Sequence, residues 1–125
     1  MEKTNLKERT KKFALDMIDL CETLDKSLTN QVIARQLIRC STSVGANYRA
    51  ASRAKSQADF INKMKIVEEE ADESIYFMEL LKEKNKRLIN LAPLYNEANE
   101  ILSMVVASIK TARKSPGSKL VTRRS

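Results

Sequence analysis

The sequence has no histidine and no tryptophan, and only two residues each of glycine, proline and cysteine among its 125. Without histidine, Ser-His-Asp and Cys-His nucleophile systems and imidazole acid–base catalysis are excluded. A zinc site would need histidine or more than two cysteines, and the usual di-iron site of ferritin-like bundles also needs histidine. We therefore expect a protein that is not an enzyme and that holds no metal ion and no cofactor.

The scarcity of glycine and proline leaves little room for the tight turns of an all-β fold. Aromatic residues make up 5% of the chain, apolar residues 42% and charged residues 31%, which is typical of a globular helical protein with an aliphatic core. No apolar run is long enough to span a membrane, and the first residues lack the apolar core of a secretory signal. These features predict a cytoplasmic protein that does not enter a membrane.

Apolar residues recur at spacings of three and four along most of the chain, which is the pattern of amphipathic helices. The predicted helices cover about 6–28, 31–55, 57–84 and 93–112. We expect an all-α fold, an up-down-up-down four-helix bundle over residues 1–113, followed by a flexible basic tail over 114–125. Cys21 and Cys40 lie in apolar helical positions and form no CxxC motif, so buried free thiols are favoured over a disulfide.

Local signals mark the helix ends and one unusual position. Asn5 with Glu8 and Ser56 with Asp59 have the spacing of capping boxes, in which a side chain accepts a backbone N–H of the first helical turn. Gly45 lies inside the second predicted helix, where glycine costs about 1 kcal/mol relative to alanine. Two explanations stay open, namely the close approach of another helix or a kink.

The formal net charge of +7 favours an anionic partner such as RNA or DNA. On an ideal helix of 3.6 residues per turn, four arginines of the second helix fall on one face and form a stripe about 27 Å long. We name it the arginine stripe, and it consists of Arg35, Arg39, Arg49 and Arg53. Two interpretations compete: the stripe contacts phosphates, or it pairs with the acidic third helix, which has seven acidic residues between Ile66 and Glu83.

The tail has basic residues and no acidic ones, so it is a second candidate for nucleic-acid binding. Aromatic residues for base stacking are missing beside both patches, which argues against reading of sequence. Glu69 and Glu73, one helical turn apart, could share a cation, but a solvated acidic face is the favoured interpretation. The candidate nucleic-acid-binding residues are the arginine stripe with Lys55, Arg113, Lys114, Lys119, Arg123 and Arg124.

One stretch, residues 39–81, resembles a known family. It contains Ser43-Val44-Gly45-Ala46-Asn47, then Arg49, a helix start over 56–60, the acidic run Glu70-Ala71-Asp72-Glu73 and an apolar cluster over 76–81. This pattern is similar to that of the bacterial four helix bundle proteins, also known as 23S rRNA intervening-sequence or ribosomal-protein-like proteins. The family motif residues in this chain are Ser43, Gly45, Asn47 and Arg49.

The resemblance implies a four-helix bundle that assembles as a homopentamer with a central channel. It also implies a relationship to the accessory variability determinant of diversity-generating retroelements, a basic pentamer that binds a reverse transcriptase and nucleic acid. We therefore expect a non-enzymatic oligomer that binds RNA or DNA through phosphates. The alternative is a protein-interaction scaffold, such as an accessory subunit of a reverse transcriptase. Apolar residues beside the core stripes favour a subunit interface: Ile38, Ile61, Ile66 and Ile75.

Overall fold

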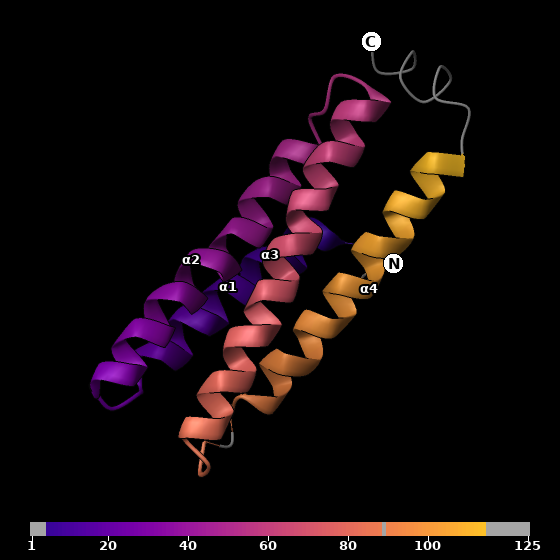
Figure 1. The fold of residues 1–125 in the computed structure, drawn as a ribbon. Coiled ribbons are helices and arrows are strands. Elements are labelled where there is room, and N and C mark those ends of the chain that lie inside the picture. The colour runs from indigo at the N-terminus through magenta and orange to yellow at the C-terminus, as the bar shows by residue number, and fades with distance from the viewer. Residues whose placement is uncertain (1–4, 89, 115–125) are drawn as a thin grey trace.

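A computed structural model describes residues 5–88 and 90–114. Over these residues it has four α-helices and no strand, with α1 at Leu6–Glu22, α2 at Leu28–Ala51, α3 at Gln57–Lys84 and α4 at Ala92–Lys114. Consecutive helices run antiparallel, and α1 and α4 also meet, which closes the bundle (Figure 1). The predicted all-α four-helix bundle is therefore confirmed.

The first connection is longer than predicted. The expected helices 6–28 and 31–55 become α1, which ends at Glu22, and α2, which begins at Leu28. The helix stops because Thr23 Oγ1 donates to the Leu20 carbonyl, and it restarts at Ser27, whose hydroxyl accepts the Asn30 N–H. Leu28, the last residue of the predicted first helix, is instead 79% exposed in the first turn of α2.

At the other end of the bundle, α2 ends at Ala51 rather than at residue 55, and α3 has the predicted bounds. Ser56 accepts the Asp59 N–H, as the capping box requires. The Asp59 carboxylate accepts the N–H of Lys55 instead of that of the cap residue, so the box is shifted by one residue. The last helix, predicted over 93–112, extends from Ala92 to Lys114, so Lys114 belongs to α4.

The core is a single aliphatic cluster along the bundle axis, to which every helix contributes. Within α3 the predicted four-three seam is buried from Met64 to Leu81, whereas Phe60 stays half-buried. Both cysteines are buried free thiols, as predicted. Burial raises the pKa of Cys21 to about 11 and also raises the pKa of Cys40.

Gly45 is the point where α2 approaches α1. A Cβ placed on Gly45 would lie 3.4 Å from Thr10 Oγ1 and 3.5 Å from the Thr10 carbonyl oxygen. The Thr10 hydroxyl is buried and donates to the Leu6 carbonyl, so it belongs to the packed wall of α1. Of the two explanations for this glycine, close approach of another helix is the one the structure supports. The neighbouring Ala46 is exposed and takes no part in the crossing.

One ionic cluster joins α1 to α4. The Arg9 guanidinium lies 2.6 Å from Glu97 Oε1 and 2.8 Å from Glu100 Oε1. Hydrogen bonds to these carboxylates raise the pKa of Arg9 further above its ordinary value. The cluster therefore uses one basic residue and two acidic residues inside a subunit and leaves none of the three free for a partner.

Candidate nucleic-acid interface

The four arginines of the arginine stripe are all exposed, three of them on α2 and Arg53 in the connection that follows it, but they differ in their partners. Arg39 pairs with α3, because its guanidinium lies 2.5 Å from Glu73 Oε1 and 3.3 Å from Glu70 Oε1. Arg35, Arg49 and Arg53 form no ion pair with any residue that the structure describes. The pairing interpretation therefore holds for Arg39, and phosphate contact stays a prediction for the other three arginines.

Electrostatics around Arg39 support this division. Its bond to Glu73 raises the pKa of Arg39, while burial, more than the nearby Glu73, raises the pKa of Glu70. A guanidinium held by two carboxylates is a poor ligand for phosphate, since a phosphate would have to displace one of them. Arg39 is therefore part of the α2–α3 packing rather than of a free basic surface.

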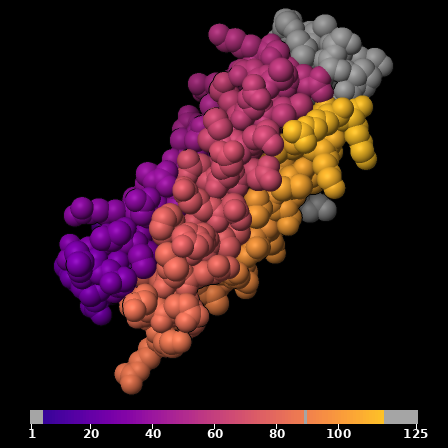
Figure 2. Space-filling view, in the orientation of Figure 1, coloured from indigo at the N-terminus to yellow at the C-terminus, as the bar shows by residue number. Residues whose placement is uncertain are grey.

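Two of the three unpaired arginines, Arg49 and Arg53, lie at the end of the bundle where α2 runs into α3. The C-terminal end of α4 lies at this same end (Figure 1). The Gln57 side chain in the first turn of α3 donates to the Ala112 carbonyl in the last turns of α4, which fixes the two segments together. In the space-filling view, the surface of the last α4 turns, in yellow, adjoins that of the start of α3 (Figure 2).

This arrangement gathers two sequence-separated sets of cations into one surface, which we name the basic end. It consists of Arg49, Arg53, Lys55, Lys63, Lys110, Arg113 and Lys114. All except Lys63 are exposed, and Lys63 pairs with Asp59 at 2.6 Å. That bond is the main reason why the pKa of Asp59 is lowered. Asp59 is the only acidic residue between 49 and 65, and none lies between 101 and 114.

Lys110 is a member of the basic end that sequence reasoning missed. It stands one turn before Arg113 and Lys114 on α4, and its signal was the lack of any acidic residue after Glu100. Of the other candidates, Lys55, Arg113 and Lys114 lie in the basic end. Lys119, Arg123 and Arg124 lie outside the described residues, in the segment that follows Lys114 directly in the chain.

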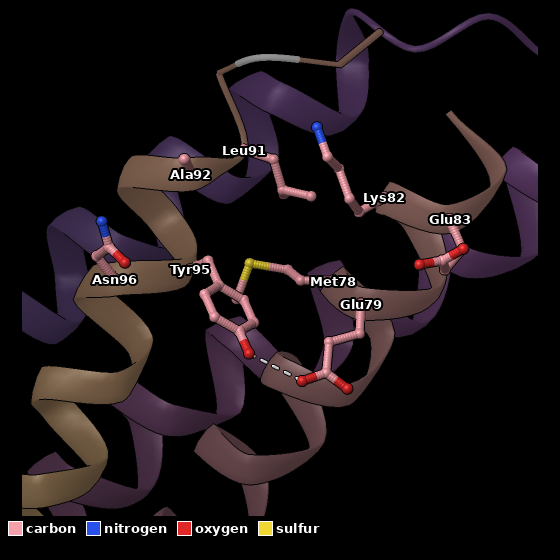
Figure 3. Close-up of a pocket in the computed structure, with 8 residues that line it drawn as sticks. All are labelled: Met78, Glu79, Lys82, Glu83, Leu91, Ala92, Tyr95 and Asn96. Carbon is pink, nitrogen blue, oxygen red and sulfur yellow. Dashed lines mark hydrogen bonds between the residues drawn. The ribbon is translucent and has the colours of Figure 1, made fainter. Parts of the chain in front are cut away.

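Along α3 and α4, beyond the basic end, two hollows are lined by acidic residues. Between α3 and α4, a hollow of about 330 Å³ is lined by Glu68, Glu69 and Asp72, next to Lys65. Further along the same helix pair, another hollow of about 270 Å³ has Met78, Leu91 and Tyr95 against it and the carboxylates of Glu79 and Glu83 beside them (Figure 3).

In that second hollow the Tyr95 hydroxyl donates to Glu79 at 2.9 Å, and this bond raises the pKa of Tyr95. Two carboxylates beside one ammonium group, that of Lys82, repel a phosphate more than they attract it. The two hollows between α3 and α4 are therefore unsuited to nucleic acid.

The family motif residues serve packing more than binding. Asn47 donates to the Ser43 carbonyl one turn earlier, and both side chains are half-buried. Gly45 allows α1 to pack closely against α2, and Arg49 is the only one of the four motif residues that is exposed. Three of the four motif residues therefore shape α2, while the fourth begins the basic end.

Two further properties bear on function. Over residues 5–88 and 90–114, no three His, Cys, Asp or Glu side chains come together in a way that could hold a metal ion. In the same part of the chain, no helix is both long and apolar enough to cross a membrane. A cation held between Glu69 and Glu73 would therefore have no third such side chain to bind it, and Glu73 already pairs with Arg39.

Comparison with known proteins shows a similarity to one family and to a solved structure. The family model described as 23S rRNA-intervening sequence protein matches residues 2–107. A solved structure from Bacteroides thetaiotaomicron VPI-5482 is 34% identical and superimposes with a TM-score of 0.76, covering 83% of this chain and 97% of that one. It is described as a protein with unknown function from the S23 ribosomal protein family. No curated protein matches the chain. Neither description names an enzymatic activity.

Proposed function

The chain belongs to the 23S rRNA-intervening sequence protein family, and we propose that it is a non-enzymatic cytoplasmic bundle that binds nucleic acid, RNA above all, through phosphate contacts at the basic end. The observation that carries the proposal is the convergence of unpaired cations from α2 and α4 at one end of the bundle. Exposed guanidinium and ammonium groups without carboxylate partners are free to replace the counterions of a phosphate backbone.

The charge count shows how strongly the positive charge is concentrated. The segments that contain the basic end, residues 49–65 and 110–125, have 11 of the 23 basic residues and one of the 16 acidic residues. The rest of the chain therefore has 12 basic and 15 acidic residues, a net charge of −3. The whole positive excess belongs to one end of the molecule and the segment that follows it, so a polyanion is drawn to a defined place.

Binding of a labelled structured RNA, followed by fluorescence anisotropy over a range of salt concentrations, tests the proposal. We expect Arg49→Gln with Arg53→Gln to weaken binding to RNAs of unrelated sequence and to flatten the salt dependence. The matched control is Lys26→Gln with Lys84→Gln, which removes the same charge from exposed positions at the opposite end of the bundle. Equal effects of the two pairs would reject the basic end as the site. No binding by the wild type at low salt would reject the function.

We also propose that the protein assembles with copies of itself, into five subunits as the family resemblance suggests. Four large apolar side chains support an interface because they are at least half exposed: Leu15, Leu28, Val32 and Tyr76. Of the residues that the sequence suggested for this role, Ile66 is 40% exposed, Ile38 and Ile61 are half-buried against the core, and Ile75 is buried in it. The interface role of Ile75 is therefore wrong, and that of Ile66 stays a prediction.

Light scattering measures the assembly directly. Val32→Asp should shift the mass toward that of one subunit, whereas Lys26→Asp, an equally exposed position on the adjoining connection, should leave it unchanged. A wild-type mass of one subunit at micromolar concentration would reject self-assembly. In that case the exposed apolar side chains would favour the alternative, a surface for a different protein such as a reverse transcriptase.

A further inference from the structure

We infer that the basic end binds double-stranded nucleic acid in preference to single strands, an inference that rests on the proposed function of this surface. Three properties of the described residues carry it, namely the placement of the aromatic side chains, the arrangement of the cations in two rows and the rigidity of the elements that hold them. Each of them favours the paired phosphate backbones of a duplex, which RNA and DNA duplexes share.

The aromatic side chains offer no platform for unpaired bases. Proteins that bind single strands stack successive bases on aromatic side chains, and each stacked base contributes about 1–3 kcal/mol. All six aromatic residues of this chain lie in its described part, and Tyr76 is the only one that is exposed. Tyr48 and Phe60, the two within the segments that form the basic end, are half-buried and pack against the core.

Tyr76 is also badly placed for nucleic acid. It lies in the acidic half of α3, three residues from both Glu73 and Glu79, and its ring is packed edge-on against that of Phe77 with the centroids 5.4 Å apart. Carboxylates one turn away on either side would repel the phosphates that accompany a stacked base. A single strand would thus gain phosphate contacts alone from this protein.

The cations themselves form two rows rather than a line. Arg49 is in the last turn of α2 and Arg53 follows in the connection, and Lys110, Arg113 and Lys114 occupy the end of α4. The first turn of α3 lies between them, because Gln57 bonds to α4 and Ser56 caps the helix directly after the α2 connection. Cations from two separate segments can contact both of the strands that flank a duplex groove. A single strand supplies one row of phosphates.

The rigidity of the surface adds to this preference. All these cations except Arg53 and Lys55 are on helices, and the α2–α3 connection is held by hydrogen bonds of the Arg53 and Ala54 amides to α2. A duplex is itself stiff, with a persistence length of about 50 nm, and carries one charge per about 1.7 Å of its axis. A fixed array of cations meets it with little loss of entropy, whereas a flexible strand must be ordered on binding.

The experiment compares short RNA and DNA duplexes with unpaired oligo(U) and oligo(dT) of equal length, by anisotropy at one salt concentration. We expect both duplexes to bind at least about tenfold more tightly than either single strand, since no stacking compensates the lower charge density. Equal or tighter binding of the single strands would overturn the inference and leave the proposed function standing. Binding of none of the four at low salt would overturn the proposed function itself.

Variants test the two rows separately. Arg49→Gln with Arg53→Gln should make the salt slope on duplex DNA shallower by about 1.8, from about 0.9 per phosphate contact. Arg113→Gln with Lys114→Gln should have the same effect, and Lys26→Gln with Lys84→Gln should have none. All six side chains are exposed and none forms an ion pair with the described residues, so the folds should persist, which circular dichroism checks. A slope that responds to one basic-end pair only would overturn the two-row arrangement.

Discussion

Gly45, where α2 packs against α1, allows a series of substitutions whose effect on the free energy of unfolding changes sign with the size of the side chain. Alanine at this position adds a Cβ at 3.4–3.6 Å from three atoms of Thr10, which is ordinary van der Waals contact. It also removes the glycine penalty, about 1 kcal/mol in a helix interior. We therefore expect Gly45→Ala to be neutral or to stabilise the fold by up to about 1 kcal/mol.

Gly45→Leu should have the opposite effect. Its further carbon atoms would need the space of Thr10, which is fixed because its hydroxyl donates to the Leu6 carbonyl at 2.7 Å. Overpacking of this kind costs about 1–3 kcal/mol, which exceeds the gain in helix propensity. At about 4 °C per kcal/mol for a domain of this size, the leucine variant should melt up to about 10 °C below the alanine variant.

Thermal unfolding followed by circular dichroism measures both variants, and light scattering of the same samples shows whether assembly is retained. Ala46→Leu is the matched control, since Ala46 is the next residue of α2 and is exposed. A leucine variant at position 45 that melts above the wild type with its assembly intact would refute the close contact between α1 and α2.

Three other predictions concern buried or capping groups. Burial raises the pKa of Cys21 to about 11 and also raises the pKa of Cys40. We therefore expect Ellman's reagent at pH 8 to react slowly with the native protein and to detect two thiols once the protein is unfolded. Fast reaction of the native protein would contradict the burial of the thiols. Asn30→Ala should destabilise the fold by about 1–3 kcal/mol in chemical denaturation, since it leaves its partner Asn85 without the amide it bonds; an unchanged midpoint would refute this. Asp59→Asn should lower the melting temperature at neutral pH. Since the lowered pKa stabilises the fold only while the carboxylate is ionised, the difference from wild type should vanish as the pH falls through that pKa, and a constant difference would count against an ionic cap.

The fold could be predicted from the sequence because its signals are local. Hydrophobic periodicity and the Ser56 cap determine α3, and the two antiparallel connections around it are short enough to fix the order of the helices. The error at the first connection has a local cause too. Leu24 and Leu28 continue the apolar spacing of α1, yet Thr23 and Ser27 end one helix and begin the next. Capping outweighs periodicity there, so Leu28 is exposed.

The site was harder to predict because charge positions along the chain do not reveal which opposite charges meet. Only the register of α2 against α3 brings Glu70 and Glu73 to Arg39 and leaves Arg49 free, and Arg53, predicted on the same helix, lies beyond the end of α2. The same register, with the Gln57 bond to Ala112, brings Arg49 and Arg53 to the same end of the bundle as the last turns of α4, although the two segments are far apart in the sequence. Pairing partners and patch continuity are long-range properties, which depend on how helices align and not on any window of sequence. A sequence can therefore state how much positive charge the bundle has, but the alignment of α2, α3 and α4 decides that the surplus lies at one end.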